Sequence, residues 1–401
     1  MTGKQIFRQI LKILPVLTLA AALFWGYQKL QDSIPDQLYV FSGEKNPLEE
    51  LQENPLVSWD EAVTAAGSDA YTVSCSLCGV LPLKTVKVQQ IPKEQVMVSG
   101  EHIGIYMETS GVLIIDSGQL QGADGLVCEP AAHIVQSGDY IMQINGETLE
   151  NKKELMEQVA ASNGEPMELQ VLRREELITL SLTPVKTQDG SYKLGIWVRD
   201  NIQGIGTLTF VRQDGSFGAL GHGISDTDTG ELLHLSQGEL YQADLLSINK
   251  GQDGNPGELR GSITYADSRK LGTINSNLEN GIYGQLETSD GVPLKPYEIA
   301  LKQDVTTGPV TILCDVEGEV GEYQAEITEI DWNKQDTNKS FTIHITDPRL
   351  LEVTGGIVQG MSGSPVIQNG RLVGAVTHVF IRDSAQGYGI FIENMLTADS
   401  L

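Results

Sequence analysis

The sequence predicts a mainly β protein with an N-terminal transmembrane helix, a small α+β module and a C-terminal β-barrel domain. Residues 13–27 contain no charged side chain and follow a basic segment. Residues 93–185 combine strand-like alternation with one run at helical spacing. From Leu194 onward, short runs of Val, Ile, Leu and Thr are separated by Gly, Asp and Asn, with turn signals about every 8–12 residues. This last pattern is typical of an all-β barrel or sandwich.

Composition narrows the classes of partner. The chain has 401 residues, which suits two or three domains, and 27 Lys and Arg against 53 Asp and Glu give a net charge of −26. This charge argues against a nucleic-acid partner, which would favour a basic face, and against an anionic membrane surface. The cysteines include one C-x-x-C pair, Cys75 and Cys78, with no second pair and no histidine pair. We therefore expect no metal, no cofactor and no disulfide framework.

Residues 1–31 are predicted to be a basic cytoplasmic tail and a signal-anchor helix. The uncharged core of 15 residues is shorter than the roughly 20 that a comfortable span needs. Lys12 and Lys29 can extend it by snorkelling, and Trp25 and Tyr27 suit the interface. The alternative is a signal peptide that is cleaved after Ala20–Ala22. Bulky residues follow these alanines, so the anchor is favoured. In both cases the chain after about residue 35 is expected to lie on the far side of the membrane from the N-terminus.

Residues 32–92 are interpreted as an acidic spacer with short strands that begin near Tyr71. Residues 93–185 follow as a module with strands around Gly111, a helix over Lys152–Ser162 capped by Asn151, and a final hairpin. This order and the string SGDYIMQING resemble a PDZ domain. The resemblance implies binding of a C-terminal carboxylate by a backbone loop, for which Ile103, Gly104, Ile105 and Tyr106 are the best match. The alternative is a folded spacer that binds nothing.

The segment Thr354–Val379 carries the predicted nucleophile. Ser362 lies in the string GMSGSP and is followed by a hairpin with an Asn369-Gly370 turn. A serine on a glycine-rich turn suits acyl transfer, because the backbone N–H groups of Gly360 and Ser362 can form an oxyanion hole. Ser364 is the rival nucleophile. Taken alone, the string is also compatible with an ordinary turn.

His222 is the predicted general base, because it lies between glycines in GALGHGISD at the end of an apolar strand. His378 alternates within a strand and is interpreted as a sheet or core histidine. The acid that orients the base stays open on the residues alone. Asp347 precedes Ser362 by 15 positions, but Asp226, Asp244 and Asp315 are alternatives, and an Asp before Pro is often a turn former.

Several strings together carry a resemblance to a known family: GALGHGISD, PGELRG, GIYG and TDPRLLEVTGGIVQGMSGSPVIQNGRLVGAVTHVF. With the N-terminal anchor and the PDZ-like module, the chain resembles the stage IV sporulation protein B peptidase family. Members are membrane-tethered serine endopeptidases of endospore-forming bacteria. The resemblance implies a chymotrypsin-like β-barrel protease domain over residues 186–401. It also places the family's catalytic triad on His222, Asp347 and Ser362.

The resemblance further implies a location and partners. The family acts in the space between the forespore membranes and cleaves a partner in a membrane complex, which releases an intramembrane protease that matures a late sigma factor. Members also cleave themselves, and the PDZ domain is implicated in recognising the own chain or the partner. Two alternatives are a tethered PDZ adaptor with a non-cleaving protease domain and a quality-control protease. The second is disfavoured because such proteases usually carry the PDZ domain after the protease domain.

Overall fold

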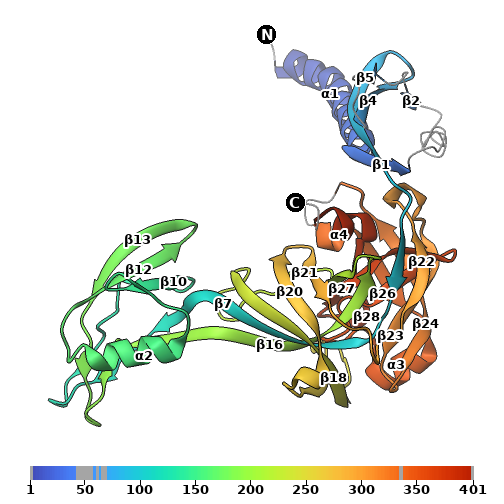
Figure 1. Ribbon diagram of the computed structural model, residues 1–401. Helices are drawn as coiled ribbons and strands as arrows, with labels where there is room; N and C mark the ends of the chain where they lie inside the picture. The colour runs from blue at the N-terminus through green and yellow to red at the C-terminus, as the bar shows by residue number, and fades with distance from the viewer. Residues whose placement is uncertain (1–2, 42–56, 60–62, 65–69, 334–336, 399–401) are drawn as a thin grey trace.

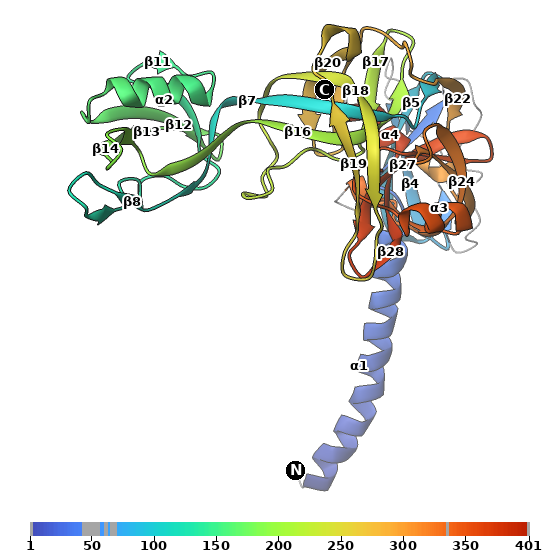
Figure 2. The same cartoon turned by 90° about the horizontal axis from the view of Figure 1, so that it is seen from below.

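The computed structural model describes residues 3–41, 57–59, 63–64, 70–333 and 337–398. The first element is the helix α1 (Gly3–Asp32), which projects from the rest of the chain with the N-terminus at its far end (Figure 2). Its segment Ile13–Asp32 is long and apolar enough to cross a membrane, with a mean hydropathy of 1.3. The C-terminal part of α1 contacts the next domain, because the Tyr27 hydroxyl donates to the Pro82 carbonyl at 2.7 Å.

A small sheet occupies the region that was expected to be a spacer. Its strands lie in the order β1-β5-β4-β2, with β3 beside β4. Buried aliphatic side chains such as Leu38, Val73 and Val86 form a core of its own. The sheet consists of β1 (Gln37–Phe41), β2 (Val57–Trp59), β3 (Val63–Thr64), β4 (Ala70–Leu77) and β5 (Leu81–Ile91).

Six strands then close a first barrel. Each strand pairs antiparallel with the next around the ring, in the order β7-β16-β17-β21-β20-β18 and back to β7. Its core contains Ile103, Ile105, Phe217 and Leu240. The strands are β7 (His102–Ser117), β16 (Ile196–Val211), β17 (Ser216–Ala219), β18 (Leu235–Asn249), β20 (Lys270–Leu278) and β21 (Gly281–Leu286).

A second ring of six strands follows, in the order β23-β24-β25-β28-β27-β26 and back to β23. The predicted hairpin is confirmed, since Asn369 and Gly370 turn with φ of 52° and 76° between β26 and β27. Two barrels side by side agree with the predicted chymotrypsin-like fold class. The strands are β23 (Gly308–Asp315), β24 (Val320–Ile330), β25 (Phe341–Ile345), β26 (Pro365–Gln368), β27 (Arg371–Phe380) and β28 (Asp383–Phe391).

Two short strands join the barrels: β6 (Gln95–Val98) pairs with β16 of the first, and β22 (Lys295–Ile299) pairs with β6 and with β27 of the second. An apolar cluster between the barrels contains Val98, Phe210, Tyr283 and Leu372. The remaining elements of this region are β19 (Glu258–Ile263), α3 (Pro348–Thr354), α4 (Ile392–Ala398) and the 3₁₀ turns Asp267–Arg269, Lys302–Asp304 and Thr337–Lys339.

The PDZ-like module, defined here as residues 112–198, is inserted into the first barrel. It lies at one end of the molecule, and β7 and β16 run from it into the barrel as a long ribbon (Figure 1). The helix α2 (Lys152–Ala161) begins after Asn151, whose side chain accepts from the Glu154 N–H as expected. The other elements are β8 (Leu120–Gln121), β9 (Val127–Cys128), β10 (Tyr140–Ile144), β11 (Glu147–Thr148), β12 (Met167–Arg173), β13 (Glu176–Leu182), β14 (Val185–Lys186) and β15 (Tyr192–Lys193).

This insertion moves the expected domain boundaries. Residue 93 was expected to start the PDZ domain, but β6 and the first half of β7 belong to the barrels. The first half of β16 conversely lies in the module, where Ile196 and Val198 pack on its core. These boundaries depend on strand pairing between residues about a hundred positions apart. The periodicity of apolar residues along the chain does not indicate which distant strand a segment pairs with.

Candidate active site

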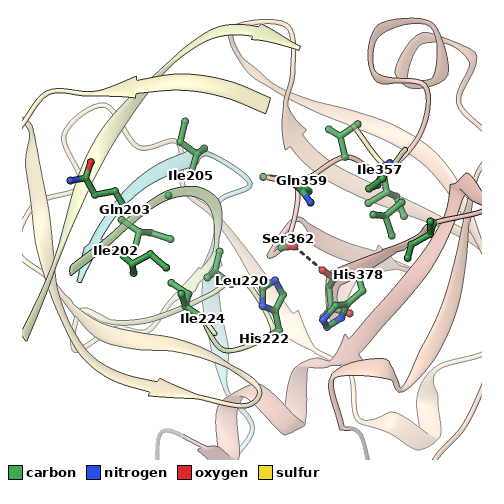
Figure 3. Close-up of a pocket in the computed structure, with 18 residues that line it drawn as sticks. Ile202, Gln203, Ile205, Leu220, His222, Ile224, Ile357, Gln359, Ser362 and His378 are labelled. Carbon is green, nitrogen blue, oxygen red and sulfur yellow. Dashed lines mark hydrogen bonds between the residues drawn. The ribbon is translucent and has the colours of Figure 1, made fainter. Parts of the chain in front are cut away.

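A cavity of about 510 Å³ lies between the two barrels. His222, which follows β17 of the first barrel, and Ser362, which precedes β26 of the second, both line it (Figure 3). Gly360 lines the same cavity. The structure therefore brings together the predicted base, the predicted nucleophile and both predicted oxyanion donors, which come from segments more than a hundred residues apart.

A tight backbone turn directs His222 into this cavity. Leu220 and Gly221 both have φ of 69°, and the Gly221 N–H donates to the Ala219 carbonyl at 2.9 Å. A left-handed conformation is costly for leucine and marks a constrained turn. Gly221 is required for a second reason, because a Cβ there would lie 2.8 Å from Ile390 and 2.9 Å from Thr377 of the second barrel. The turn thus sets His222 at the contact between the barrels.

The His222 ring is held by the backbone. Its Nδ1 lies 2.8 Å from the carbonyl oxygen of Gly223. In the tautomer with the proton on Nδ1, this bond leaves Nε2 free to accept a proton. Burial lowers the pKa of His222 below its ordinary value of 6.5, and the bond to Gly223 opposes that shift only in part. The ring is therefore neutral at pH 7, which is the form that a general base needs.

The nucleophile loop is also ordered by hydrogen bonds. The Ser362 hydroxyl donates to the Thr377 carbonyl at 2.7 Å, which is the dashed line in Figure 3. Among the described residues no bond joins this hydroxyl to His222, so attack on a substrate requires rotation of the serine side chain away from Thr377. Catalytic hydrogen bonds often form only when substrate is bound.

The backbone of the loop leaves donors for an oxyanion. The N–H of Gly363 donates to Val376 at 2.8 Å and that of Ser364 to Met361 at 3.0 Å. In contrast, the N–H groups of Gly360 and Ser362 make no hydrogen bond within the described parts of the chain. Gly360 has φ of 101°, a conformation that glycine tolerates. Two neighbouring N–H groups without a partner in the described parts of the chain are what the predicted oxyanion hole requires.

Thr207 of β16, which sequence reasoning missed, fixes this loop from the first barrel. Its N–H donates to the Ser362 carbonyl at 3.0 Å, and its hydroxyl donates to the Gly360 carbonyl at 2.9 Å. Thr209 on the same strand donates to the Gly363 carbonyl at 2.8 Å. A threonine that alternates within a strand gives no local signal of this role, because its partners are more than 150 residues away.

Ser364, the rival nucleophile, is placed differently. It is fully buried, and its hydroxyl has no hydrogen-bond partner among the described residues. It does not line the cavity, whereas Ser362 does. Accessibility from the cavity therefore favours Ser362 over Ser364 as the nucleophile.

The structure does not bring Asp347 to His222, which corrects the expected triad. The Asp347 side chain is 4% exposed and caps α3 by accepting from the Arg349 N–H at 2.9 Å. Its other oxygen accepts from the Arg349 guanidinium at 2.9 Å and from the Gln324 N–H at 3.2 Å. The Arg349 guanidinium is the main cause that lowers the Asp347 pKa to about 2. An Asp followed by Pro at a helix start is a cap, and here both carboxylate oxygens are used locally.

The alternative acids also have local partners. Asp226 is buried and ion-paired with Arg199, Asp244 pairs with Arg269 at 2.7 Å, and Asp315 accepts from the Gly318 N–H at 2.8 Å. Within the described residues no hydrogen bond joins His222 to any carboxylate. The Gly223 carbonyl is bonded to the His222 ring, and the centroid of the His378 ring lies 4.9 Å from that of His222. Glu279 and Lys339 line a second pocket that His222 and His378 share.

His378 was expected to be a sheet or core histidine, and it does lie in β27. It also lines the cavity beside His222 and Ser362. Its position follows from strand pairing, since β27, which carries it, pairs with β26 directly after the loop of Ser362. The local signal that could have found it is the short distance in sequence from the nucleophile hairpin.

The four residues proposed for carboxylate capture are not in a loop. Ile103, Gly104, Ile105 and Tyr106 lie in β7, where they pair with β16 on one edge and with β18 on the other. Their backbone groups are thus committed to the barrel, and Ile103 and Ile105 are core residues. A peptide strand cannot add at this position, because both edges are already occupied. The expectation was wrong because apolar alternation fits a barrel strand as well as a PDZ loop.

In the described parts of the chain, no group of three or more His, Cys, Asp and Glu side chains could hold a metal ion.

Comparisons with known proteins identify the family of the chain. A family model described as SpoIVB peptidase S55 matches residues 190–396, just over half of the chain. No curated protein matches. The crystal structure of the PDZ domain of an SdrC-like protein from Listeria monocytogenes is 18% identical, with a TM-score of 0.19; the match covers 22% of this chain and 87% of that one. The family model confirms the resemblance inferred from the sequence: the chain belongs to the SpoIVB peptidase family.

Proposed function

We propose that the chain is a serine endopeptidase in which Ser362 is the nucleophile and His222 the general base. The observation that carries this proposal is the meeting of the two side chains in one cavity between the barrels, beside the unpaired N–H groups of Gly360 and Ser362. His222 Nε2 accepts the Ser362 proton as the serine oxygen attacks a peptide carbonyl. The two N–H groups stabilise the oxyanion, and the protonated His222 then gives its proton to the leaving amine. Water attacks the acyl-enzyme and regenerates the serine.

The Gly223 carbonyl takes the place that a carboxylate has in the usual triad. It accepts the Nδ1 proton of His222 and so fixes the tautomer and the ring orientation. A carbonyl carries only a partial charge and stabilises the imidazolium less than a carboxylate does. We therefore expect turnover to be slow compared with peptidases whose histidine faces an ionised acid.

A fluorophosphonate probe tests the assignment of the nucleophile. The purified full chain should form a covalent adduct on Ser362, and the Ser362→Ala variant should form none. Ser364→Ala is the matched control, since it removes a buried hydroxyl that has no partner among the described residues. Labelling that persists in Ser362→Ala would refute the assignment, and an unlabelled wild-type chain would favour the tethered adaptor.

The biological role proposed here rests on the family and on the apolar helix. The chain is proposed to be anchored by α1 in the forespore intermembrane space and to act in sporulation. Its substrates would be its own chain and a protein of a membrane complex that controls intramembrane processing of a sigma factor. Incubation of the wild-type chain with purified Ser362→Ala chain tests self-cleavage. Fragments of the inactive chain are expected, and an intact chain after prolonged incubation would contradict it.

A further inference from the structure

The cleft that holds Ser362 and His222 carries no charged side chain. Eighteen residues line it, and none of them is Asp, Glu, Lys or Arg. Charged residues make up 20% of the chain, so an average set of eighteen would contain about four. Its two titratable groups, His222 and His378, line it together with Ser362, and these three residues are called the floor of the cleft.

Aliphatic side chains form the walls on each side of the floor. Ile202 and Ile205 from β16 lie on one side of the serine, and Ile357 lies on the other (Figure 3). Ile381, at the turn between β27 and β28, is 66% exposed at the same cleft. The remaining aliphatic lining is Ile105, Leu220, Ile224, Val358 and Val379. Ile105, Leu220, Ile357 and Val358 are buried, so the surface open to a ligand comes from Ile381 and from the partly exposed Ile202, Ile205, Ile224 and Val379. Covering such apolar surface is favourable by about 25 cal/mol per Å².

The same walls disfavour a charged side chain. A Lys or Glu side chain that entered the cleft would lose hydration and meet no opposite charge among the described lining residues. Because Ser362 lies on the floor, the side chains that enter are those beside the bond that is cut. The preference for apolar over charged side chains at this position therefore affects the rate of the reaction itself, and not only the binding of substrate segments far from the scissile bond.

We propose that this cleft selects protein segments with a bulky aliphatic residue, such as Leu, Ile or Val, next to the scissile bond. The inference rests on the proposed peptidase function and names its substrate class.

A set of fluorogenic peptides tests the selectivity with the purified full chain. The peptides are identical except for one position, immediately before or immediately after the scissile bond, which carries Leu, Val, Ala, Gln, Lys or Glu. In at least one of the two series, kcat/KM for Leu and Val should exceed that for Ala by about tenfold or more, since one methylene in an apolar pocket changes rates roughly 10-fold or more. Lys and Glu peptides should be the poorest substrates.

A variant of the cleft itself sharpens the test. Gln203 is exposed on β16 at the cleft, and Gln203→Glu adds a negative charge with almost no change of shape. We expect the ratio of kcat/KM for Lys over Leu peptides to rise at least threefold. Gln121→Glu is the matched control, because Gln121 is exposed on β8 in the PDZ-like module and does not line the cleft; its ratio should stay at the wild-type value.

The outcomes separate the two proposals. If the fluorophosphonate labels Ser362 but Leu, Ala and Lys peptides are cleaved equally, or Gln203→Glu leaves the ratio unchanged, the selectivity is refuted and the peptidase assignment stands. If Ser362 is not labelled and no peptide is cleaved, both proposals are refuted.

Discussion

The backbone N–H of Thr207 in the first barrel donates a hydrogen bond to the carbonyl of Ser362 in the second, with the nitrogen and oxygen 3.0 Å apart. Its hydroxyl holds the carbonyl of Gly360 at 2.9 Å. Fixing these two carbonyls fixes the peptide planes of the loop, on which the direction of the Gly360 and Ser362 N–H groups depends. The proposed oxyanion donors on one barrel are thus oriented by a strand of the other, so a change in how the barrels meet would alter the geometry of Gly360 and Ser362.

Thr207→Val should therefore lower kcat with little effect on KM. Valine keeps the shape of the side chain but removes the hydroxyl that donates to Gly360. The Gly360 carbonyl is then left without this partner, which destabilises the ordered loop by about 1–3 kcal/mol. We expect kcat to fall about tenfold, which corresponds to roughly 1.4 kcal/mol. Thr207→Ser retains the hydroxyl and should restore most of the rate. Steady-state kinetics decide the matter, and equal kinetics in the Val and Ser variants would show that the hydroxyl is dispensable.

Asp347→Asn should leave turnover within a few-fold of the wild type. Asparagine caps a helix as well as aspartate does, so α3 keeps its start. A triad acid changed to Asn would instead lose about 10⁴ in kcat. The measurement is kcat together with the thermal unfolding midpoint, since a large loss of kcat at an unchanged midpoint would make Asp347 the orienting acid.

Asp347→Ala serves as the contrast for stability. It removes the cap and the carboxylate that pairs with Arg349, and we expect the free energy of unfolding to drop by about 1–3 kcal/mol. Because the pKa of Asp347 is lowered to about 2, its contribution is present above the unfolded value of 3.8 and is lost as the pH falls toward 2. The difference in stability between wild type and Asp347→Ala should shrink over that range.

Local chemistry explains which site residues could be predicted from the sequence. Glycines around His222 and Ser362 indicate tight turns that expose a side chain, and the structure places both residues at one cavity. The prediction failed where long-range pairing decides the outcome. Ile103–Tyr106 alternates as any strand does, and only its partners in β16 and β18 show that it belongs to the barrel.

The role predicted for Asp347 was wrong and the role of Thr207 was missed, for opposite reasons. Asp347 stands before Pro348, a local helix-start signal that the structure confirms as a cap, whereas its catalytic role came from resemblance alone. Thr207 carries no local signal, because its function lies entirely in contacts with a loop 155 positions later. Sequence reasoning therefore found Ser362 and His222, the two residues that meet in the cavity, and missed the threonine that positions the loop of Ser362.

The pH dependence of activity should reflect the lowered pKa of His222. Burial disfavours the charged ring, so His222 stays neutral below pH 6.5, where an ordinary histidine is already half protonated. We expect kcat/KM to be retained at pH 6.5 and to fall only as the pH drops through the lower pKa. A pH profile of kcat/KM measures this directly, and a midpoint at or above 6.5 would contradict the burial that the structure shows.

Stability should change with pH in the same window. The unfolded chain binds a proton at His222 near pH 6.5, whereas the folded chain binds it only at lower pH. The unfolded state therefore holds more protons in between, and the free energy of unfolding falls as the pH drops below 6.5. His222→Gln removes this contribution, so its stability should depend less on pH between 6.5 and the lower pKa than that of the wild type.

Leu233→Ala should lower activity from outside the cleft. Leu233 packs with Leu113 and Tyr140 at the base of the PDZ-like module, and Ile202 and Ile224 join this cluster while also lining the cleft. The Leu233 N–H also donates to the Ile224 carbonyl at 3.0 Å, which ties the cluster to the loop that carries His222. Truncation should cost about 2–5 kcal/mol of stability and shift this loop. We expect kcat/KM to fall about tenfold at a temperature where the chain remains folded.

Leu182→Ala separates this effect from a general loss of stability. Leu182 is equally buried but lies in the module's own core, away from the cluster that reaches the cleft. Its truncation should cost a similar free energy of unfolding and leave kcat/KM close to the wild-type value. If both variants lose activity in proportion to their stability, the cluster does not couple the module to the site. If only Leu233→Ala loses activity, the module acts on His222 through these packed side chains, since they connect it to the loop of His222 in addition to the ribbon of β7 and β16.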